Sequence, residues 1–108
     1  MSETKTIWVT GSKGFIGGEL VNRLDKHGYR VVGTDSELSV CEPERLDAFA
    51  NEIRPDIIIN CAGIPRAATG ISNRIKAYEV NALGARNVAV VANSVNALMV
   101  QISTDDVY

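Results

Sequence analysis

Short apolar runs alternate with one-faced amphipathic stretches along the whole chain. The apolar runs are candidate strands, at residues 5–10, 29–35, 57–59 and 98–102. The stretches between them repeat apolar residues every three or four positions, which is the period of an α-helix. These candidate helices cover residues 15–27, 43–53 and 72–94. The first has Phe15, Ile16 and Leu20 along its apolar face and is followed by Gly28, a left-handed cap. Gly84 inside the third indicates a tight backbone contact, because glycine disfavours a helix interior. The pattern therefore predicts the element order β-α-β-α-β-α-β.

The apolar runs lack the alternation of a half-exposed strand. Ile57, Ile58 and Ile59 follow one another directly, so a strand there would present apolar side chains on both of its faces. Strands buried on both faces are typical of a parallel sheet with helices on either side. Because parallel crossovers are right-handed, we expect a Rossmann-type, doubly wound α/β sheet with the strand order 3-2-1-4.

Three glycines follow the first candidate strand at the spacing G-x-x-G-x-x-G. Gly11 would allow a sharp turn, because glycine reaches positive φ without steric cost. Gly14 has no side chain, so a pyrophosphate could approach the backbone, and Gly17 would let the next helix pack tightly on the strand. The unpaired N–H groups at the start of that helix favour an anion. The stretch predicts a site for the phosphates of a dinucleotide.

The glycine spacing alone is a weak signal, because 9 glycines in 108 residues produce some such spacing by chance. An ordinary strand-to-helix turn would look similar. Asp35 changes the picture, since it stands 18 residues after Gly17 at the end of the second candidate strand. Nucleotide-binding folds place there the acid that accepts hydrogen bonds from the adenosine ribose. Glycine turn and acid together predict a dinucleotide site.

Composition and charge argue against several other functions. The net charge is −2 and no basic cluster occurs, so we expect no nucleic-acid partner. No apolar stretch approaches the roughly 20 residues needed to span a bilayer, and the first six residues are polar, so we expect a cytoplasmic protein without a membrane partner. Cys41 and Cys61 form no C-x-x-C motif and His27 is the only histidine, so no metal site is expected.

Four segments of the chain, in order and suitably spaced, match the motifs of one enzyme family. They read TGSKGFIG over 10–17, NCAG over 60–63, VNALG over 80–84 and STD over 103–105. They resemble motifs of the extended short-chain dehydrogenase/reductases, the NAD-dependent epimerase/dehydratase family that acts on nucleotide sugars. Within it, the likeness is greatest to the dTDP-4-dehydrorhamnose reductases. The resemblance implies a nicotinamide cofactor and a nucleotide-sugar substrate.

The resemblance also assigns roles that the residue patterns do not. It implies that the cofactor-binding residues are Gly11, Lys13, Gly14, Phe15, Ile16, Gly17, Asp35, Ala62, Gly63 and Asn81. Asn81 would help to order the site, and Thr104 would be catalytic by hydrogen-bonding the reacting oxygen. From the residues alone, Asn81 could also be a helix-surface residue and Thr104 the cap of a strand end.

Two residues point to different forms of the cofactor. Asp35 would accept the ribose hydroxyls and repel the 2′-phosphate of NADP, which favours NAD. Lys13 stands where related reductases have a basic residue for that phosphate. We expect NAD to be preferred and NADP to be tolerated.

One motif of the family is missing. Its proton donor is a tyrosine followed four residues later by a lysine, and none of Tyr29, Tyr78 and Tyr108 is followed in that way. We therefore expect residues 1–108 to be the N-terminal part of a NAD(P)-binding Rossmann domain, inactive alone. The parent would be an oxidoreductase or epimerase, and a homodimer is a further expectation. The alternative is a non-catalytic regulatory or scaffold protein on the same fold.

Overall fold

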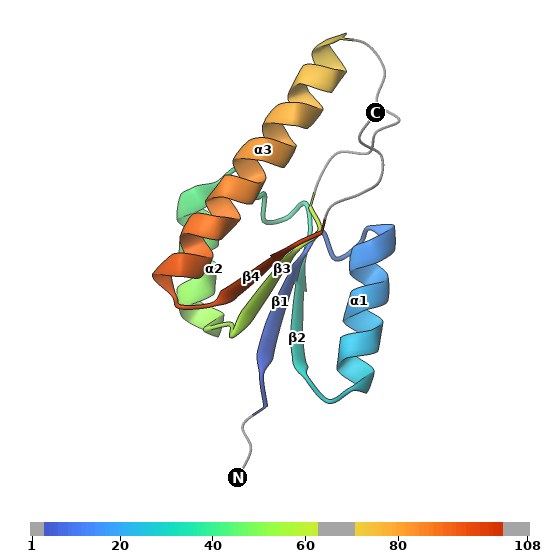
Figure 1. Cartoon of the computed structure of the whole chain (residues 1–108), viewed down its shortest axis with the longest axis vertical. Helices are drawn as coiled ribbons and strands as arrows, with labels where there is room; N and C mark the ends of the chain where they lie inside the picture. The colour runs from blue at the N-terminus through green and yellow to red at the C-terminus, as the bar shows by residue number, and fades with distance from the viewer. Residues whose placement is uncertain (1–3, 63–70, 103–108) are drawn as a thin grey trace.

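The computed structural model describes residues 4–62 and 71–102, in which seven elements alternate as the pattern predicts (Figure 1). The strands are β1 (Thr6–Thr10), β2 (Arg30–Thr34), β3 (Ile57–Asn60) and β4 (Leu98–Gln101). The helices are α1 (Phe15–Lys26), α2 (Pro43–Ile53) and α3 (Ile71–Ser94). The predicted Rossmann-type α/β class is confirmed, and the predicted bounds agree closely with these. No helix of the described part is long and apolar enough to cross a membrane.

The strand order, however, is not the expected 3-2-1-4. All strands are parallel and lie in the order β2-β1-β3-β4, so β3 pairs with β1 on the side away from β2. The reason is the position of α2, which covers the face of the sheet opposite to α1 (Figure 1). Right-handed crossovers on opposite faces run in opposite directions along a sheet. The order 3-2-1-4 would have needed α1 and α2 on one face.

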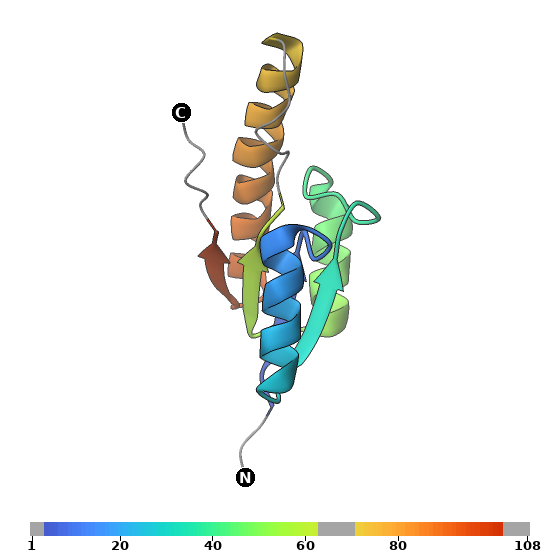
Figure 2. The ribbon, with the colours of Figure 1, turned by 90° about the vertical axis from the view of Figure 1, so that its right-hand side faces the viewer.

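Each face of the sheet has its own hydrophobic core. Trp8 and Ile58 point to the face covered by α2 and α3, where their buried neighbours are Leu38, Val40, Leu46, Ala50, Val88, Val91 and Ala92. Ile7, Val9 and Ile59 point to the other face, where they pack against Leu20, Val21 and Leu24 of α1. Figure 2 shows this second face, with the sheet behind α1. The apolar runs are therefore buried on both sides, as predicted.

Trp8 links three elements of the larger core. Its ring is fully buried and lies against the ring of Phe49 in α2, with 5.1 Å between the centroids. Its Nε1 donates a hydrogen bond of 2.9 Å to Oγ1 of Thr34 in β2. The bond satisfies the one polar group of the indole, which would be costly to bury unpaired. Trp8 thus connects β1 to both β2 and α2.

The first turn of α1 corrects one sequence-based expectation. The apolar pattern assigned Phe15 and Ile16 to the buried face of the helix, but Phe15 is 95% exposed and Ile16 is 41% exposed. Both stand in the first turn, at the carboxyl ends of the strands. The apolar side chains that pack on the sheet begin one turn later, at Leu20. α1 ends at Lys26, and Gly28 two residues later has the positive φ, +89°, that was predicted for the cap.

β4 is the outer strand of the described sheet, and it lacks the charge or proline that usually protects such an edge. Leu98 is 63% exposed and Val100 is 38% exposed. They lie opposite Ile57 and Ile59, so they face the α1 side of the sheet.

We predict that the 108-residue chain associates with itself as its concentration rises, because an unprotected apolar strand edge pairs with other strands. Sedimentation velocity over a concentration series measures this. Val100→Lys should reduce the association, whereas Val90→Lys, at an exposed position of α3, should not. A monomer that unfolds cooperatively at high concentration would contradict the prediction.

Candidate functional site

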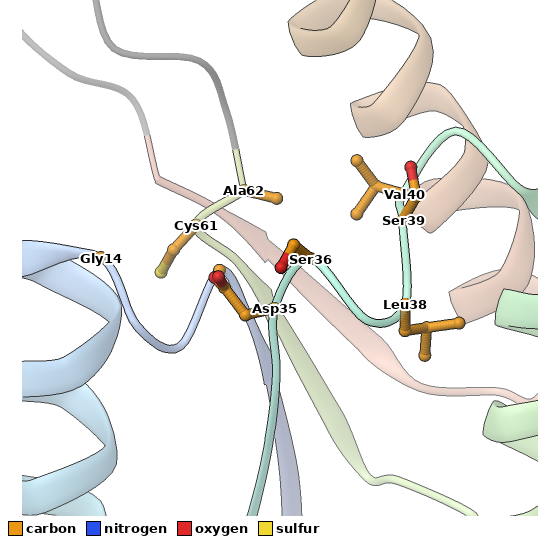
Figure 3. A pocket seen from close by; sticks show the side chains of 9 residues that line it. Gly14, Asp35, Ser36, Leu38, Ser39, Val40, Cys61 and Ala62 are labelled. Atoms are coloured by element: carbon orange, nitrogen blue, oxygen red, sulfur yellow. The ribbon is translucent and has the colours of Figure 1, made fainter.

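The carboxyl ends of the strands meet at one edge of the sheet, where a cavity of about 320 Å³ opens (Figure 3). Its lining residues are Gly11, Gly14, Asp35, Ser36, Leu38, Ser39, Val40, Cys61 and Ala62. They belong to the segments that follow β1, β2 and β3. The volume falls in the range of about 300–1,000 Å³ that is typical of small-molecule sites. In an open α/β sheet, ligands bind at this edge, where the crossovers diverge.

The glycine turn after β1 packs directly on the segment after β3. Gly11 has a φ of +65°, as predicted for a sharp turn. A Cβ atom at Gly11 would lie only 2.8 Å from the backbone nitrogen of Ala62. A Cβ atom at Gly17 would lie 2.2 Å from the carbonyl oxygen of Gly11. The tight packing expected at Gly17 is therefore present, but its partner is the turn itself rather than the strand.

A buried hydrogen-bond network joins the ends of β1, β3 and β4. Thr10 and Asn60 are each 1% exposed, and Oγ1 of Thr10 donates to Oδ1 of Asn60 at 2.5 Å. Nδ2 of Asn60 donates to Oε1 of Gln101 at 2.8 Å. Oγ1 of Thr10 also accepts the backbone N–H of Cys61 at 3.2 Å. This network holds the glycine turn and the segment after β3 in a fixed relation.

Sequence reasoning treated Thr10 and Asn60 only as letters of motifs and missed their structural role. A signal was nevertheless present, because each is a polar residue at the end of a strand that is otherwise apolar and buried. Buried polar side chains require hydrogen-bond partners, and two such residues on neighbouring strands can satisfy each other. Among the described residues, no buried side-chain nitrogen or oxygen lacks a partner.

Asp35 reaches the cavity from the end of β2, as predicted (Figure 3). Its Oδ1 lies 3.4 Å from the backbone nitrogen of Lys13, which donates to it. The backbone N–H of Asp35 donates to Oε1 of Glu37 at 2.9 Å. Hydrogen bonds from the backbone of Asp35 and of Glu37 itself lower the pKa of the Glu37 carboxyl, and the charge of Lys13 lowers it further. Glu37 is therefore ionised at neutral pH.

Two helices hold the loop that forms the outer wall of the cavity. From α2, Nη2 of Arg45 donates to the carbonyl oxygen of Glu37 at 3.0 Å. From α3, Nδ2 of Asn87 donates to the carbonyl oxygen of Val40 at 3.0 Å. A Cβ atom at Gly84 would lie 2.5 Å from Cγ2 of Val40, which confirms the close contact expected at this helical glycine. Sequence reasoning did not find the roles of Arg45 and Asn87.

Of the other predicted site residues, Ala62 lines the cavity beside Cys61. Burial raises the pKa of the Cys61 thiol, so this part of the wall is uncharged at neutral pH. Asn81 lies on α3 and is not among the lining residues. Gly63 and Thr104 fall outside the described residues. Within residues 4–62 and 71–102, no group of side chains could hold a metal ion.

We predict that Gly17→Ala lowers the free energy of unfolding by about 1–3 kcal/mol, because a methyl group cannot fit against the Gly11 carbonyl without displacing the turn. Urea denaturation measures the loss. The neighbouring Gly18→Ala is the control, since a Cβ there would make an ordinary contact of 3.4 Å with the Ser12 carbonyl oxygen. Alanine in place of a helical glycine should stabilise by up to about 1 kcal/mol. Equal stability of both variants would contradict the packing described.

Comparison with known proteins adds independent information. The family model described as "RmlD substrate binding domain" matches residues 5–108. The dTDP-4-dehydrorhamnose reductase of Streptomyces griseus is 32% identical over 101 residues, which cover 93% of this chain and 33% of that protein. The chain thus spans about a third of the length of this curated relative.

Solved structures match the fold along most of the chain. The crystal structure of dTDP-4-dehydrorhamnose reductase from Bacillus anthracis in complex with NADP superposes with a TM-score of 0.89 at 35% identity, covering 100% of this chain and 39% of that one. UDP-glucose 4-epimerase of Thermus thermophilus, solved with NAD, gives a TM-score of 0.77 at 22% identity over 85% of this chain and 35% of that one. At that identity, the second likeness shows the fold alone.

Proposed function

We propose, since the chain belongs to the RmlD substrate binding domain family, that it holds the nicotinamide dinucleotide of an enzyme acting on nucleotide sugars. The parent protein would transfer hydride between that cofactor and a sugar carbonyl. The curated relative and the structure at 35% identity are both dTDP-4-dehydrorhamnose reductases, which supports a dTDP-linked sugar as the substrate class.

One observation carries the proposal. Gly11 and Gly14 follow the first strand and Asp35 follows the second, yet all three line one cavity. A backbone suited to phosphate and a carboxylate suited to ribose hydroxyls therefore border the same space, which supports the proposal. Among the described residues, no side chain caps the start of α1 and no acid stands in its first turn. Its N–H groups are thereby left to an anion, which supports placing the pyrophosphate there.

We propose roles for the remaining predicted residues on the basis of the family resemblance. Gly17 would keep the turn closed, Ala62 and Gly63 would lie along the cofactor, and Asn81 would order the site. Phe15 and Ile16 would contribute to cofactor binding from the first turn of α1. When bound, the nicotinamide would supply or accept the hydride, while Thr104 would hydrogen-bond the reacting sugar oxygen.

We propose NAD as the preferred cofactor, with NADP tolerated. The Asp35 carboxylate faces the cavity and accepts the N–H of Lys13, so it is oriented toward the place where ribose hydroxyls would bind. Its negative charge would repel a 2′-phosphate. The Bacillus anthracis reductase was solved in complex with NADP, which supports the tolerance of NADP.

Binding of reduced dinucleotides tests the proposal directly. Trp8 is the only tryptophan, so energy transfer from it to bound NADH or NADPH reports both dissociation constants. We expect saturable binding, with NADH bound more tightly than NADPH. Tenfold tighter binding of NADPH would contradict the preference, and lack of saturable binding by either would contradict the function.

Asp35→Asn should weaken NADH binding by about tenfold or more, because hydrogen bonds to a charged acceptor contribute roughly 1.5–3 kcal/mol. The same titration measures the loss. Asp25→Asn is the matched control, since Asp25 is an exposed acid at the far end of α1. If the two substitutions had equal effects on NADH binding, Asp35 would not be a cofactor-binding residue.

The 108-residue chain should show no turnover with a 4-keto nucleotide sugar, because it contains no Tyr-x-x-x-Lys. A ketone needs a proton donor within hydrogen-bond distance of its oxygen, and an ordinary threonine hydroxyl is too weak an acid for that role. We expect the motif in the reading frame beyond Tyr108. Turnover by the chain, or a stop codon directly after Tyr108 in the native gene, would favour a different account. A downstream sequence without the motif would favour the non-catalytic alternative.

A further inference from the structure

Glu37 is an acidic side chain held beside the candidate site without lining it. Its Oε1 accepts the backbone N–H of Asp35 at 2.9 Å, so the side chain folds back over the end of β2. Its own carbonyl oxygen is fixed by Nη2 of Arg45 at 3.0 Å. Although exposed, Glu37 is therefore anchored at both its backbone and its carboxylate.

The charges around Asp35 are unevenly balanced. Asp35 and Glu37 place two carboxylates at the end of β2. The backbone of Lys13 is bonded to Asp35, and the charge of Lys13 acts on Glu37. Arg45 also stands near, but its guanidinium is engaged by Oε1 of Glu42 at 3.2 Å and by the Glu37 carbonyl oxygen. Two carboxylates and the charge of Lys13 therefore lie together at the end of β2.

A phosphorylated ribose would need the groups that Glu37 occupies. A phosphate is bound by N–H donors and by cationic side chains. At this position the Asp35 N–H is already donated to Glu37, and the charge of Lys13 acts on the Glu37 carboxyl and lowers its pKa. A ribose with free hydroxyls needs only the Asp35 carboxylate as an acceptor.

We propose that Glu37 is a specificity-determining residue that disfavours a 2′-phosphorylated dinucleotide by competing with the phosphate for Lys13 and for the backbone N–H of Asp35. The inference rests on the proposed function, because it concerns the ligand of the same cavity. It goes further by naming a second acid, which no part of the motif pattern indicates. It also explains how NAD could be preferred although Lys13 is present.

The test compares NADH and NADPH binding to the full chain and to its Glu37→Gln variant by energy transfer from Trp8. Glutamine keeps an oxygen that can accept the Asp35 N–H but removes the charge. We expect the dissociation constant of NADPH to fall by about three- to tenfold at low salt, and that of NADH to change by less than about twofold. The gain should shrink at about 0.5 M salt, where exposed charges are screened.

Two controls make the outcome specific. Glu52→Gln makes the same change of charge at an exposed position near the end of α2, and it should leave the NADPH-to-NADH ratio unaltered. In a Lys13→Met background, the effect of Glu37→Gln should become smaller, because the Lys13 charge that Glu37→Gln would free for the phosphate is no longer present. Urea denaturation of each variant verifies that the fold is intact.

The results separate this inference from the proposed function. The unaltered chain could bind NADH while Glu37→Gln and Glu52→Gln show the same ratio of NADPH to NADH dissociation constants. The proposed role of Glu37 would then be wrong, but the proposed dinucleotide site would be supported. If the unaltered chain binds neither dinucleotide, the proposed function fails and this inference fails with it.

Discussion

The close contact between the backbone of Gly11 and that of Ala62 is the constraint on which the site depends. A side chain at Gly11 would overlap the segment after β3, so glycine is required for the two loops to meet. The meeting also requires β3 to lie next to β1, as it does in the order β2-β1-β3-β4. The hydrogen bonds of Thr10 and Asn60 then fix the loops at the distance that leaves a cavity. Strand order, glycine turn and buried network thus form one arrangement.

The wall of the cavity shows how packing far from the glycine turn contributes to the site. The loop after β2 has no regular structure of its own, yet α2 holds it at Glu37 and α3 holds it at Val40. The contact at Gly84 lets α3 approach this loop more closely than any other residue would allow. A wall that is held before the ligand arrives loses less entropy on binding. Both helices therefore serve the core and the site at once.

Local patterns in the sequence predicted the elements well, because helix and strand periodicity depend on near neighbours. They did not predict the strand order, since the unbroken run Ile57–Ile59 shows burial on both faces but not which helix covers each face. That choice depends on tertiary packing, in which Trp8 turns toward Phe49 in α2. Within the candidate site, the position of Asp35 at the cavity was predictable, because it stands at the end of a strand. Glu37, Arg45 and Asn87 were not, because their partners are backbone atoms of a loop without periodicity.

The central claim is that a dinucleotide occupies the carboxyl edge of this sheet. Backbone amide spectra of the ¹⁵N-labelled chain, recorded while NAD is added, test it most directly. The account predicts saturable shifts at Gly11, Gly14, Asp35 and Ala62, which line the cavity. It predicts little change at Gly28, which follows the C-terminal end of α1. Shifts centred on Gly28, or none that saturate, would contradict it.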